Sequence, residues 1–363
     1  MRTSGSIWRN TWRRLLRNKG AVFGMSLISL SILIAVFAYV ISPDPSPDAN
    51  RIILEIGGKK PGFTQIFLLL RKDQPPPRPS FFSRLLSGEP DEYDYIPIYS
   101  VWRSNDSLLV SKYLDEGLEE KATYSLRNAA GAAVPYTVKR KTFWLGTDQF
   151  GRDILSRLLV GTRVSLSVGL ITVLISLSIG VVLGALAGFY RGKTDDLIMW
   201  FINVMWSIPS LLLVFAITLM LGKGFWQIFI AIGLIMWVST ARIVRGQVLA
   251  VRQLEYVLAA RALGLSDFRI IFRHILPNIL GPVMVVSASN FASAIVIEAG
   301  LSFLGIGVQP PQPSWGLMIK ENYNFIITHN PALALAPGLA IMTLVLAFNL
   351  LGNGLRDALQ VRE

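Results

Sequence analysis

The chain has 363 residues, of which 52% are hydrophobic and only 16% are charged, and its formal net charge is +12. In soluble domains about a quarter of all residues are charged, so this composition argues against an ordinary soluble protein. The lack of cysteine excludes disulfides, zinc–thiolate sites, iron–sulfur clusters and thiol nucleophiles. The two histidines, His274 and His329, are too few for a histidine metal cluster, so no metal site is expected.

The N-terminal part of the chain is predicted to anchor it in a membrane. The apolar run at residues 21–41 matches the roughly 20 residues that a helix needs to cross the hydrocarbon core. Basic residues precede this run, and basic residues beside a span mark the cytoplasmic side. A cleaved signal peptide is the alternative, but the run is longer than the apolar region of such peptides and no small-residue cleavage site follows it. We therefore expect a basic cytoplasmic N-terminus over residues 1–20 and a transmembrane anchor helix over residues 21–42.

Residues 43–142 have a different character from the apolar runs on either side. Prolines at positions 43, 45 and 47 end the anchor helix, and the runs 95–99 and 136–138 are typical of short strands. Because the N-terminus is expected inside the cell, the segment after the first span is expected outside it. The pattern predicts a small β-rich extracytoplasmic domain, inserted between the first and second transmembrane helices.

Residues 143–363 are predicted to form the core of the protein, with five further spans. Arg191, Lys193 and the arginines of residues 242–273 fall in predicted cytoplasmic loops, which agrees with the topology. We therefore expect an all-α polytopic membrane protein with six transmembrane helices and both termini in the cytoplasm. Its positive charge lies beside apolar runs, which indicates a lipid bilayer and not nucleic acid as the partner. The five further spans are expected at residues 165–189, 197–221, 226–244, 279–304 and 333–355.

The most informative segment is the predicted cytoplasmic loop at residues 245–278. Residues 255–266 are consistent with a short docking helix, because small alanines permit close approach by another surface. Gly264 can adopt the left-handed conformation that ends a helix, and Ser266 or Asp267 can cap the next one. A solvated amphipathic helix at the membrane surface is the alternative, and the residues alone leave both open.

This loop resembles the EAA coupling loop of ABC importer permeases, which ends in the pattern I-x-L-P. The chain differs from the pattern at Leu258 and His274, and its glutamate, Glu255, stands three residues before the usual place. The positions that match are Ala259, Ala260, Gly264, Leu276 and Pro277.

Two further segments resemble the C-type permeases of dipeptide, oligopeptide and nickel importers. They are residues 144–157, which read WLGTDQFGRDILSR, and residues 300–316, which contain GLSFLGIGVQPP and PSWG. The resemblance covers the N-terminal anchor and the chain from Phe143 onward. The insert at residues 43–142 is longer than in most such permeases and has no counterpart in the pattern.

The resemblance implies a multi-pass permease subunit in the bacterial cytoplasmic membrane that is not itself an enzyme. It implies no cofactor in this chain, since partner ATPase subunits bind ATP and Mg²⁺. The implied partners are a second homologous permease, two cytoplasmic ATPases and an extracytoplasmic solute-binding protein. Peptides, of two or more residues, are the favoured cargo, with nickel chelates or another small solute as the alternative. The residues expected to couple to the ATPase are Glu255, Ala259, Ala260, Arg261, Gly264, Leu265 and Ser266, and the loop is expected to end at His274, Leu276 and Pro277.

Some residues within the spans have functional or packing interpretations. Gly180, Gly184 and Gly188 form two overlapping G-x-x-x-G units, which let helices pack closely in lipid. Pro209 removes a backbone hydrogen bond in mid-span and is expected to kink or loosen that helix. Pro209, Ser210 and Glu298 are candidates for the translocation path or gate, with a buried polar contact as the alternative for Glu298. Asn203, Asn290 and Asn349 are expected to make polar contacts between helices.

A nucleotide site within the chain is rejected. Gly192, Lys193 and Thr194 resemble the end of a P-loop, but Ala187 replaces its first glycine and a membrane helix, not a strand, precedes it. A self-sufficient secondary transporter is a second rival, but such proteins carry about a dozen spans or internal repeats.

A membrane enzyme acting on an envelope substrate is the remaining rival. It needs a cluster of catalytic side chains near a membrane face. Asp148 and Asp153, close to Arg152 and Arg157, form the densest polar set, and we interpret them instead as part of a short interfacial helix.

Overall fold

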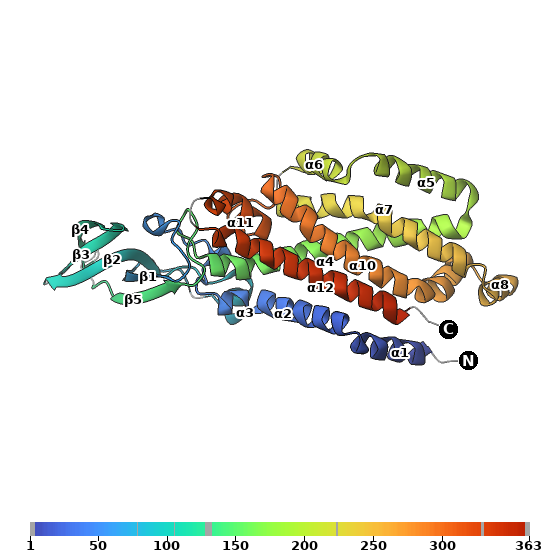
Figure 1. Cartoon of the computed structure of the whole chain (residues 1–363), viewed down its shortest axis with the longest axis horizontal. Helices are drawn as coiled ribbons and strands as arrows, with labels where there is room; N and C mark the ends of the chain where they lie inside the picture. Colours follow the sequence, from blue (N-terminus) through green and yellow to red (C-terminus); the bar gives the residue numbers. More distant parts are fainter. Residues whose placement is uncertain are drawn as a thin grey trace. The chain divides into compact units, whose positions relative to one another are not determined.

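The computed structural model describes residues 4–77, 79–104, 106–127, 133–222, 224–327 and 330–359, and its helices and strands are drawn in Figure 1. The chain divides into two compact units. The helix unit consists of Met1–Ile32, Ser165–Gln309 and Ala340–Glu363. The sheet unit consists of Leu33–Val164 and Pro310–Leu339.

Long apolar helices make up most of the chain. Among the described residues, five helical stretches are long and apolar enough to cross a membrane, or six if one bent pair of helices counts as a span. The expectation of a largely helical protein with several apolar spans is confirmed. The five stretches are α2 (Lys19–Ile41), α4 (Ile154–Tyr190), α7 (Phe225–Val251), Asp267–Phe303, which ends in α10 (Leu276–Phe303), and α12 (Ala332–Leu359).

The span expected at residues 197–221 is not one continuous helix but a bent pair of helices. α5 (Gly192–Ser207) and α6 (Ser210–Leu221) meet at an angle of 93°. Ile208 between them is extended, with φ −100° and ψ 130°, because the ring of Pro209 disfavours a helical residue before it. Proline also lacks the N–H that would continue α5. The expected kink is therefore a complete break.

Shorter helices also occur, and α4 itself begins earlier than expected. Its first residue is Ile154, ahead of the expected start of the span at position 165. With 37 residues it is about 55 Å long, well beyond the roughly 30 Å hydrocarbon core. The shorter helices include α1 (Ser4–Arg17), α8 (Glu255–Ala262), α9 (Asp267–Ile270) and α11 (Trp315–Asn322).

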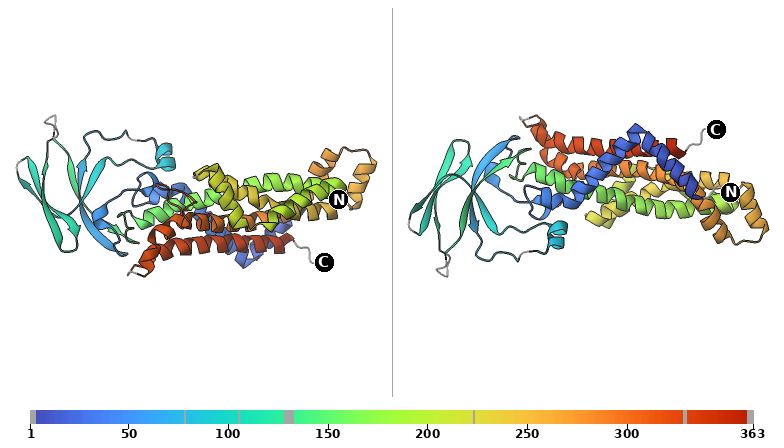
Figure 2. Two further views of the ribbon diagram at one scale, coloured as in Figure 1. Left: turned by 90° about the horizontal axis from the view of Figure 1, so that it is seen from above. Right: turned by 90° about the horizontal axis from the view of Figure 1, so that it is seen from below.

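The sheet unit contains one antiparallel five-stranded sheet in the order β4-β3-β2-β1-β5 (Figure 2). The predicted β-rich segment is therefore confirmed, and the two runs expected as strands lie in β2 and β5. A short helix, α3 (Phe81–Ser87), lies in the connection between β1 and β2. The strands are β1 (Phe63–Arg71), β2 (Tyr93–Ser104), β3 (Ser107–Asp115), β4 (Leu118–Ser125) and β5 (Tyr136–Phe143).

Apolar side chains pack on both faces of this sheet, and β1 contributes to each. Phe67 and Leu69 pack on one face with Ile56 and Phe143. Leu68, between them, packs on the other face with Leu108. Side chains alternate between the two faces of a strand, so a strand buried on both sides is apolar throughout.

The polar set at the start of α4 is not the short interfacial helix that we expected. Residues 147–153 form a loop within the sheet unit, and α4 begins after it. Arg152 donates to Asp148 at 2.6 Å and to Glu321 of α11 at 2.7 Å. Gly151 has φ +73°, and a Cβ there would overlap the carbonyl oxygen of Ile53. That backbone is incompatible with a helix, so the helical interpretation was wrong.

Candidate functional site between α7 and α10

The connection between α7 and α10 begins where α7 is tied to the end of α4. Arg252 follows α7, and its Nη1 donates to the carbonyl oxygen of Phe189 at 2.6 Å. A cation bonded to the last carbonyls of a helix also interacts favourably with the helix dipole. Burial and, after it, the nearby charges of Arg261 and Arg191 lower the pKa of Arg252. Arg252 thus links the ends of two long helices within a basic cluster.

The helix α8 has one buried side and one exposed side. Val257 and Ala260 are buried, with 1% and 5% exposure, and their spacing of three residues puts them on the same side. Of the residues of α8 that we expected to face an ATPase, Glu255, Ala259 and Arg261 are exposed. Ala260 was expected there too, but it lies on the buried side.

The end of α8 is closed by Gly264. The N–H of Leu265 donates to the carbonyl oxygen of Ala260 at 3.2 Å, which turns the chain back over the helix. Gly264 itself has φ +75°, a conformation in which glycine avoids the cost that other residues incur. No described atom lies within 4 Å of the place a Cβ would occupy, so the conformation, and not crowding, favours glycine here.

After Gly264 the chain returns to α10 through a widened helical turn. Ser266 precedes α9, and its carbonyl oxygen accepts the N–H of Ile270 at 3.0 Å. The following segment, η3 (Ile271–Ile275), is a π-helical turn in which the N–H of Leu276 donates to Ile271. Pro277 follows Leu276, as the second residue of α10. A proline ring would clash with the carbonyl group four residues earlier in a regular helix, and the wider turn relieves that clash.

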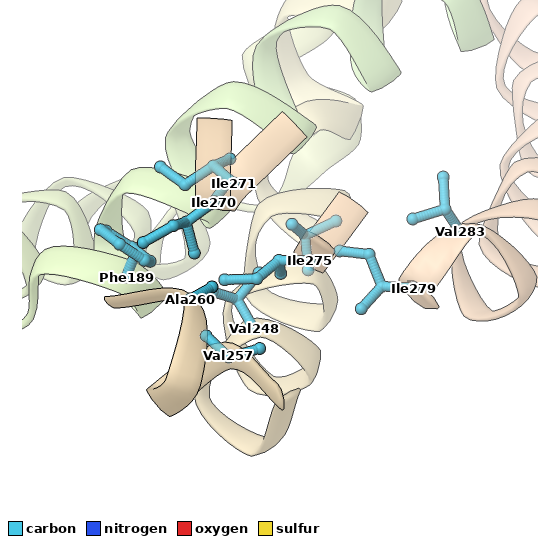
Figure 3. Packing of buried hydrophobic residues seen from close by; sticks show 11 residues of the cluster. Phe189, Val248, Val257, Ala260, Ile270, Ile271, Ile275, Ile279 and Val283 are labelled. Atoms are coloured by element: carbon cyan, nitrogen blue, oxygen red, sulfur yellow. The ribbon is translucent and has the colours of Figure 1, made fainter. Parts of the chain in front are cut away.

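A buried apolar cluster holds the whole connection together (Figure 3). It joins α8 to the end of α4, the end of α7, the π-helical turn and the start of α10. Since packed interiors resist deformation, the cluster holds α8 firmly against the ends of these helices. The cluster consists of Ala185, Phe189, Val244, Val248, Val257, Ala260, Ile270, Ile271, Ile275, Ile279 and Val283.

The opposite side of the connection exposes large apolar side chains that our prediction of the site did not include. The rings of Phe268 and Phe272 contact each other, with centroids 4.2 Å apart. Apolar side chains in an arginine-rich loop between two spans are the signal that could have identified them. We call this set the outer face of the connection: Tyr256, Leu258, Leu263, Phe268 and Phe272, with exposures of 42%, 52%, 81%, 70% and 52%.

The predicted glycine seam lies between α4 and α7 and leads to the connection. Added Cβ atoms at Gly180 and Gly184 would lie 2.6 Å and 2.8 Å from the Cβ atoms of Thr240 and Val244. At Gly188, the distance from an added Cβ to the Cβ of Val248 would be 2.8 Å. The glycines therefore allow the two helices to touch.

Polar contacts between the spans involve one of the expected asparagines. Asn290 of α10 donates to Thr240 of α7 at 3.0 Å and to Ser176 of α4 at 3.2 Å, and all three are buried. Arg245 of α7 holds Asp195 of α5 through two bonds of 2.5 and 2.6 Å. These contacts fix α4, α5, α7 and α10 to one another.

The candidate path residues lie on different elements and differ in exposure. Pro209 lies in the break between α5 and α6, Ser210 is the first residue of α6, and both are exposed. Glu298 is 1% exposed and accepts a hydrogen bond of 2.6 Å from Ser302, whose Oγ also accepts the N–H of Val308. Glu298 is thus in a buried polar contact at the end of α10.

Of the two histidines, the structure describes His274. His274 belongs to the π-helical turn, where its carbonyl oxygen accepts the side chain of Asn278 at 2.6 Å. His329 lies outside the described residues. Within the described part of the chain, no group of three or more His, Cys, Asp or Glu side chains could hold a metal ion.

The sequence is similar to two families. Residues 180–362 match the family described as binding-protein-dependent transport system inner membrane component. Residues 6–56 match the N-terminal TM domain of oligopeptide transport permease C.

Individual relatives extend the similarity. The glutathione transport system permease protein GsiD of Pectobacterium atrosepticum is 44% identical over 216 residues, which cover 60% of this chain and 71% of that protein. The oligopeptide transport system permease protein OppC of Bacillus subtilis is 41% identical over 236 residues, which cover 65% of this chain and 76% of that protein. Among solved structures, an inward-facing form of the MetNI methionine ABC transporter is similar over 56% of this chain and 97% of that chain, with a TM-score of 0.47 and 18% identity.

Proposed function

Because the chain belongs to the family of inner membrane components of binding-protein-dependent transport systems, we propose that it is a permease subunit of an ATP-driven peptide importer. Its helices form part of the peptide pathway across the bacterial cytoplasmic membrane. Transport follows alternating access, in which the helix bundle opens to one side of the membrane and then to the other.

The connection between α7 and α10 transmits the motion of a partner ATPase to the spans. One observation supports this role above the others: α8 shares a buried cluster with the ends of three long helices and exposes apolar side chains on its other side. A rigid element with an exposed apolar patch suits docking, because such patches mark interaction sites. The ATPase docks at Glu255, Ala259 and Arg261 of α8, at Gly264 just after this helix, and on the outer face of the connection.

The chain works within a larger assembly. A second, homologous permease completes the pathway, two cytoplasmic ATPases bind and hydrolyse ATP with Mg²⁺, and a solute-binding protein delivers the peptide. This chain holds no nucleotide and catalyses no reaction. GsiD and OppC are named as components of transport systems, which supports partners of this kind.

The chain crosses the membrane six times, with α5 and α6 together as one broken crossing. Both ends lie in the cytoplasm, and the sheet lies on the opposite side. The basic residues beside α2 and between α7 and α10 support this orientation. Irregular backbone at membrane depth is tolerated where it lines a wet cavity or is buried in protein, so Pro209 and Ser210 are placed on the pathway. Glu298 stabilises the end of α10 through its hydrogen bond with Ser302.

Replacement of Gly264 by valine tests the coupling role. A left-handed residue other than glycine costs about 1–2 kcal/mol, and a β-branched side chain makes this worse. Since 1.4 kcal/mol is a factor of ten in an equilibrium, we expect a roughly tenfold loss of ATPase copurification and of peptide uptake. Membrane insertion, measured by the amount of chain in washed membranes, should persist.

Gly117→Val is the matched control. Gly117 lies in the turn between β3 and β4 with φ +80°, and no described atom lies within 4 Å of its would-be Cβ. The Gly117→Val substitution imposes the same kind of backbone strain as Gly264→Val, but in a turn of the sheet. ATPase copurification of this control should therefore remain at the original level. If Gly264→Val keeps both its ATPases and its uptake, α8 is not the coupling element.

Cargo is tested with the reconstituted assembly and its binding protein. The glutathione, dipeptide and oligopeptide systems of the relatives favour short peptides. We expect labelled dipeptides or tripeptides to accumulate in vesicles in an ATP-dependent way and unlabelled peptides to compete. Accumulation of nickel chelates without peptide competition would contradict the peptide assignment.

A further inference from the structure

The short helix α3 exposes an apolar surface that neither the sheet core nor the coupling site uses. Phe81, Phe82 and Leu86 are 66%, 74% and 64% exposed, and none of the seven residues of α3 is buried. Figure 2 shows α3 at the end of a long connection, apart from the strands. Three large apolar side chains on a single helix of two turns are costly to leave in water.

α3 is nevertheless held in a fixed place by its C-terminal end. Arg163 of α4 donates to the carbonyl oxygens of Leu85 and Leu86 at 3.1 and 3.0 Å, and its guanidinium group lies 5.1 Å from the ring centroid of Tyr39 in α2. The N–H of Glu89 donates to Pro45 at 2.7 Å. The end of α3 is thus attached to both α2 and α4.

These attachment points mark the level at which two spans leave the hydrocarbon core. In α4, residues 164–190 contain no charged side chain, and Arg163 is the last charge before this stretch. In α2 and its continuation, residues 20–43 are also uncharged, and Tyr39 lies near the end of that stretch. Arginine and tyrosine at the ends of spans sit at the boundary between lipid and water.

We propose that α3 is an interfacial anchor whose Phe81, Phe82 and Leu86 insert into the membrane leaflet on the side of the sheet. The lipid surface around α2 and α4 continues onto α3, because Arg163 and Tyr39 hold the helix at the boundary. α3 carries no acidic residue that would oppose lipid headgroups, and its one charged residue is Arg84. The connection between β1 and β2 therefore fixes the sheet unit to the bilayer at a point outside the spans.

Spin labels test this placement directly, since the chain contains no cysteine and a single cysteine can be placed at will. Phe82→Cys and, as a second site, Phe81→Cys are labelled with a nitroxide in the intact transporter in lipid nanodiscs. Collisions with oxygen, which partitions into lipid, and with a water-soluble nickel chelate are then compared. Leu33→Cys in α2, at a residue 56% exposed, gives the value for a span, and Leu118→Cys in β4, at a residue 62% exposed, gives the value for water.

We expect the oxygen-to-nickel collision ratio at positions 81 and 82 to be several-fold higher than at position 118 and to approach the value at position 33. A ratio equal to that at position 118 would place α3 in water and overturn the anchor. Immobile labels that neither reagent reaches would mean that a protein partner covers α3, which also overturns it. Neither result depends on ATPase coupling, so the outcome is independent of the proposed function.

Discussion

At the scale of single residues, Asp148 is a buried charge that holds the loop before α4 in shape. It is fully buried, accepts the N–H groups of Phe150 and Arg152 at 2.9 and 3.0 Å, and pairs with the guanidinium group of Arg152. Removal of one partner from a buried pair typically costs about 3–5 kcal/mol, because the other charge is left uncompensated. We expect Asp148→Ala to lower the thermal unfolding midpoint of the purified protein strongly.

The matched control for this prediction is Asp106→Ala. Asp106 pairs with Arg127 at 2.9 Å, but both side chains are more than half exposed. Exposed pairs contribute at most about 1 kcal/mol, so the midpoint should hardly move. Equal effects of the two variants would contradict a structural role for the buried pair.

The loop that contains Asp148 and Arg152 could not be predicted from the sequence. The spacing of Asp148 and Arg152 is that of neighbours on a helix, and it suggested one. The positive φ of Gly151 and the approach of Ile53 depend on a segment about a hundred positions away, which local spacing does not contain. Gly264 was predictable, because a glycine after a short amphipathic segment is a local signal for the end of a helix.

At the scale of helices and strands, the contact between α4 and α7 depends on the absence of side chains at the glycine seam. A Cβ at Gly184 would lie 2.8 Å from the Cβ of Val244 and closer still to the carbonyl oxygen of Ala241, which is backbone and cannot rotate away. The helices must separate to admit it, and overpacking of this kind costs about 1–3 kcal/mol. We expect Gly184→Ala to lower the unfolding midpoint and reduce ATPase copurification.

Gly246→Ala is the comparison on α7 itself. No described atom lies within 4 Å of its would-be Cβ, and alanine is the better helix former by about 1 kcal/mol. The unfolding midpoint of the Gly246→Ala protein should equal or exceed that of the original protein. A Gly184→Ala protein as stable as the Gly246→Ala protein would mean that the seam is not closely packed in the membrane.

The sequence predicted the long helices better than the break between α5 and α6 or the strands. Uncharged apolar runs predicted the long helices, because length and composition decide whether a helix can span a bilayer. Pro209 indicated a disturbance but not a bend of 93°, since the angle depends on what α5 and α6 pack against. The strands were only partly visible, because β1 is buried on both faces and lacks the alternation that marks a half-exposed strand.

At the scale of the whole molecule, the sheet is an insertion whose ends meet. Phe63, the first residue of β1, pairs with Phe143, the last residue of β5, and the N–H of Gly62 donates to Phe143 at 2.9 Å. Paired residues on antiparallel strands are only about 5 Å apart, so a short glycine-containing turn can join position 62 to position 144. The buried cluster around α8 belongs to the helix unit and draws no residue from the sheet.

We therefore expect a chain without residues 63–143 to insert into the membrane and to copurify with its ATPases in about the original ratio. The reason is that coupling needs the ends of α4 and α7, α8 and the start of α10, all of which remain. Adding Gly264→Val to the shortened chain should lower copurification about tenfold, as in the full chain, which separates the coupling contact from nonspecific retention. A shortened chain that reaches the membrane in normal amounts but retains no ATPase would show that the sheet is needed for assembly on the cytoplasmic side. Such a result would contradict the conclusion that ATPase coupling depends on the helix unit alone.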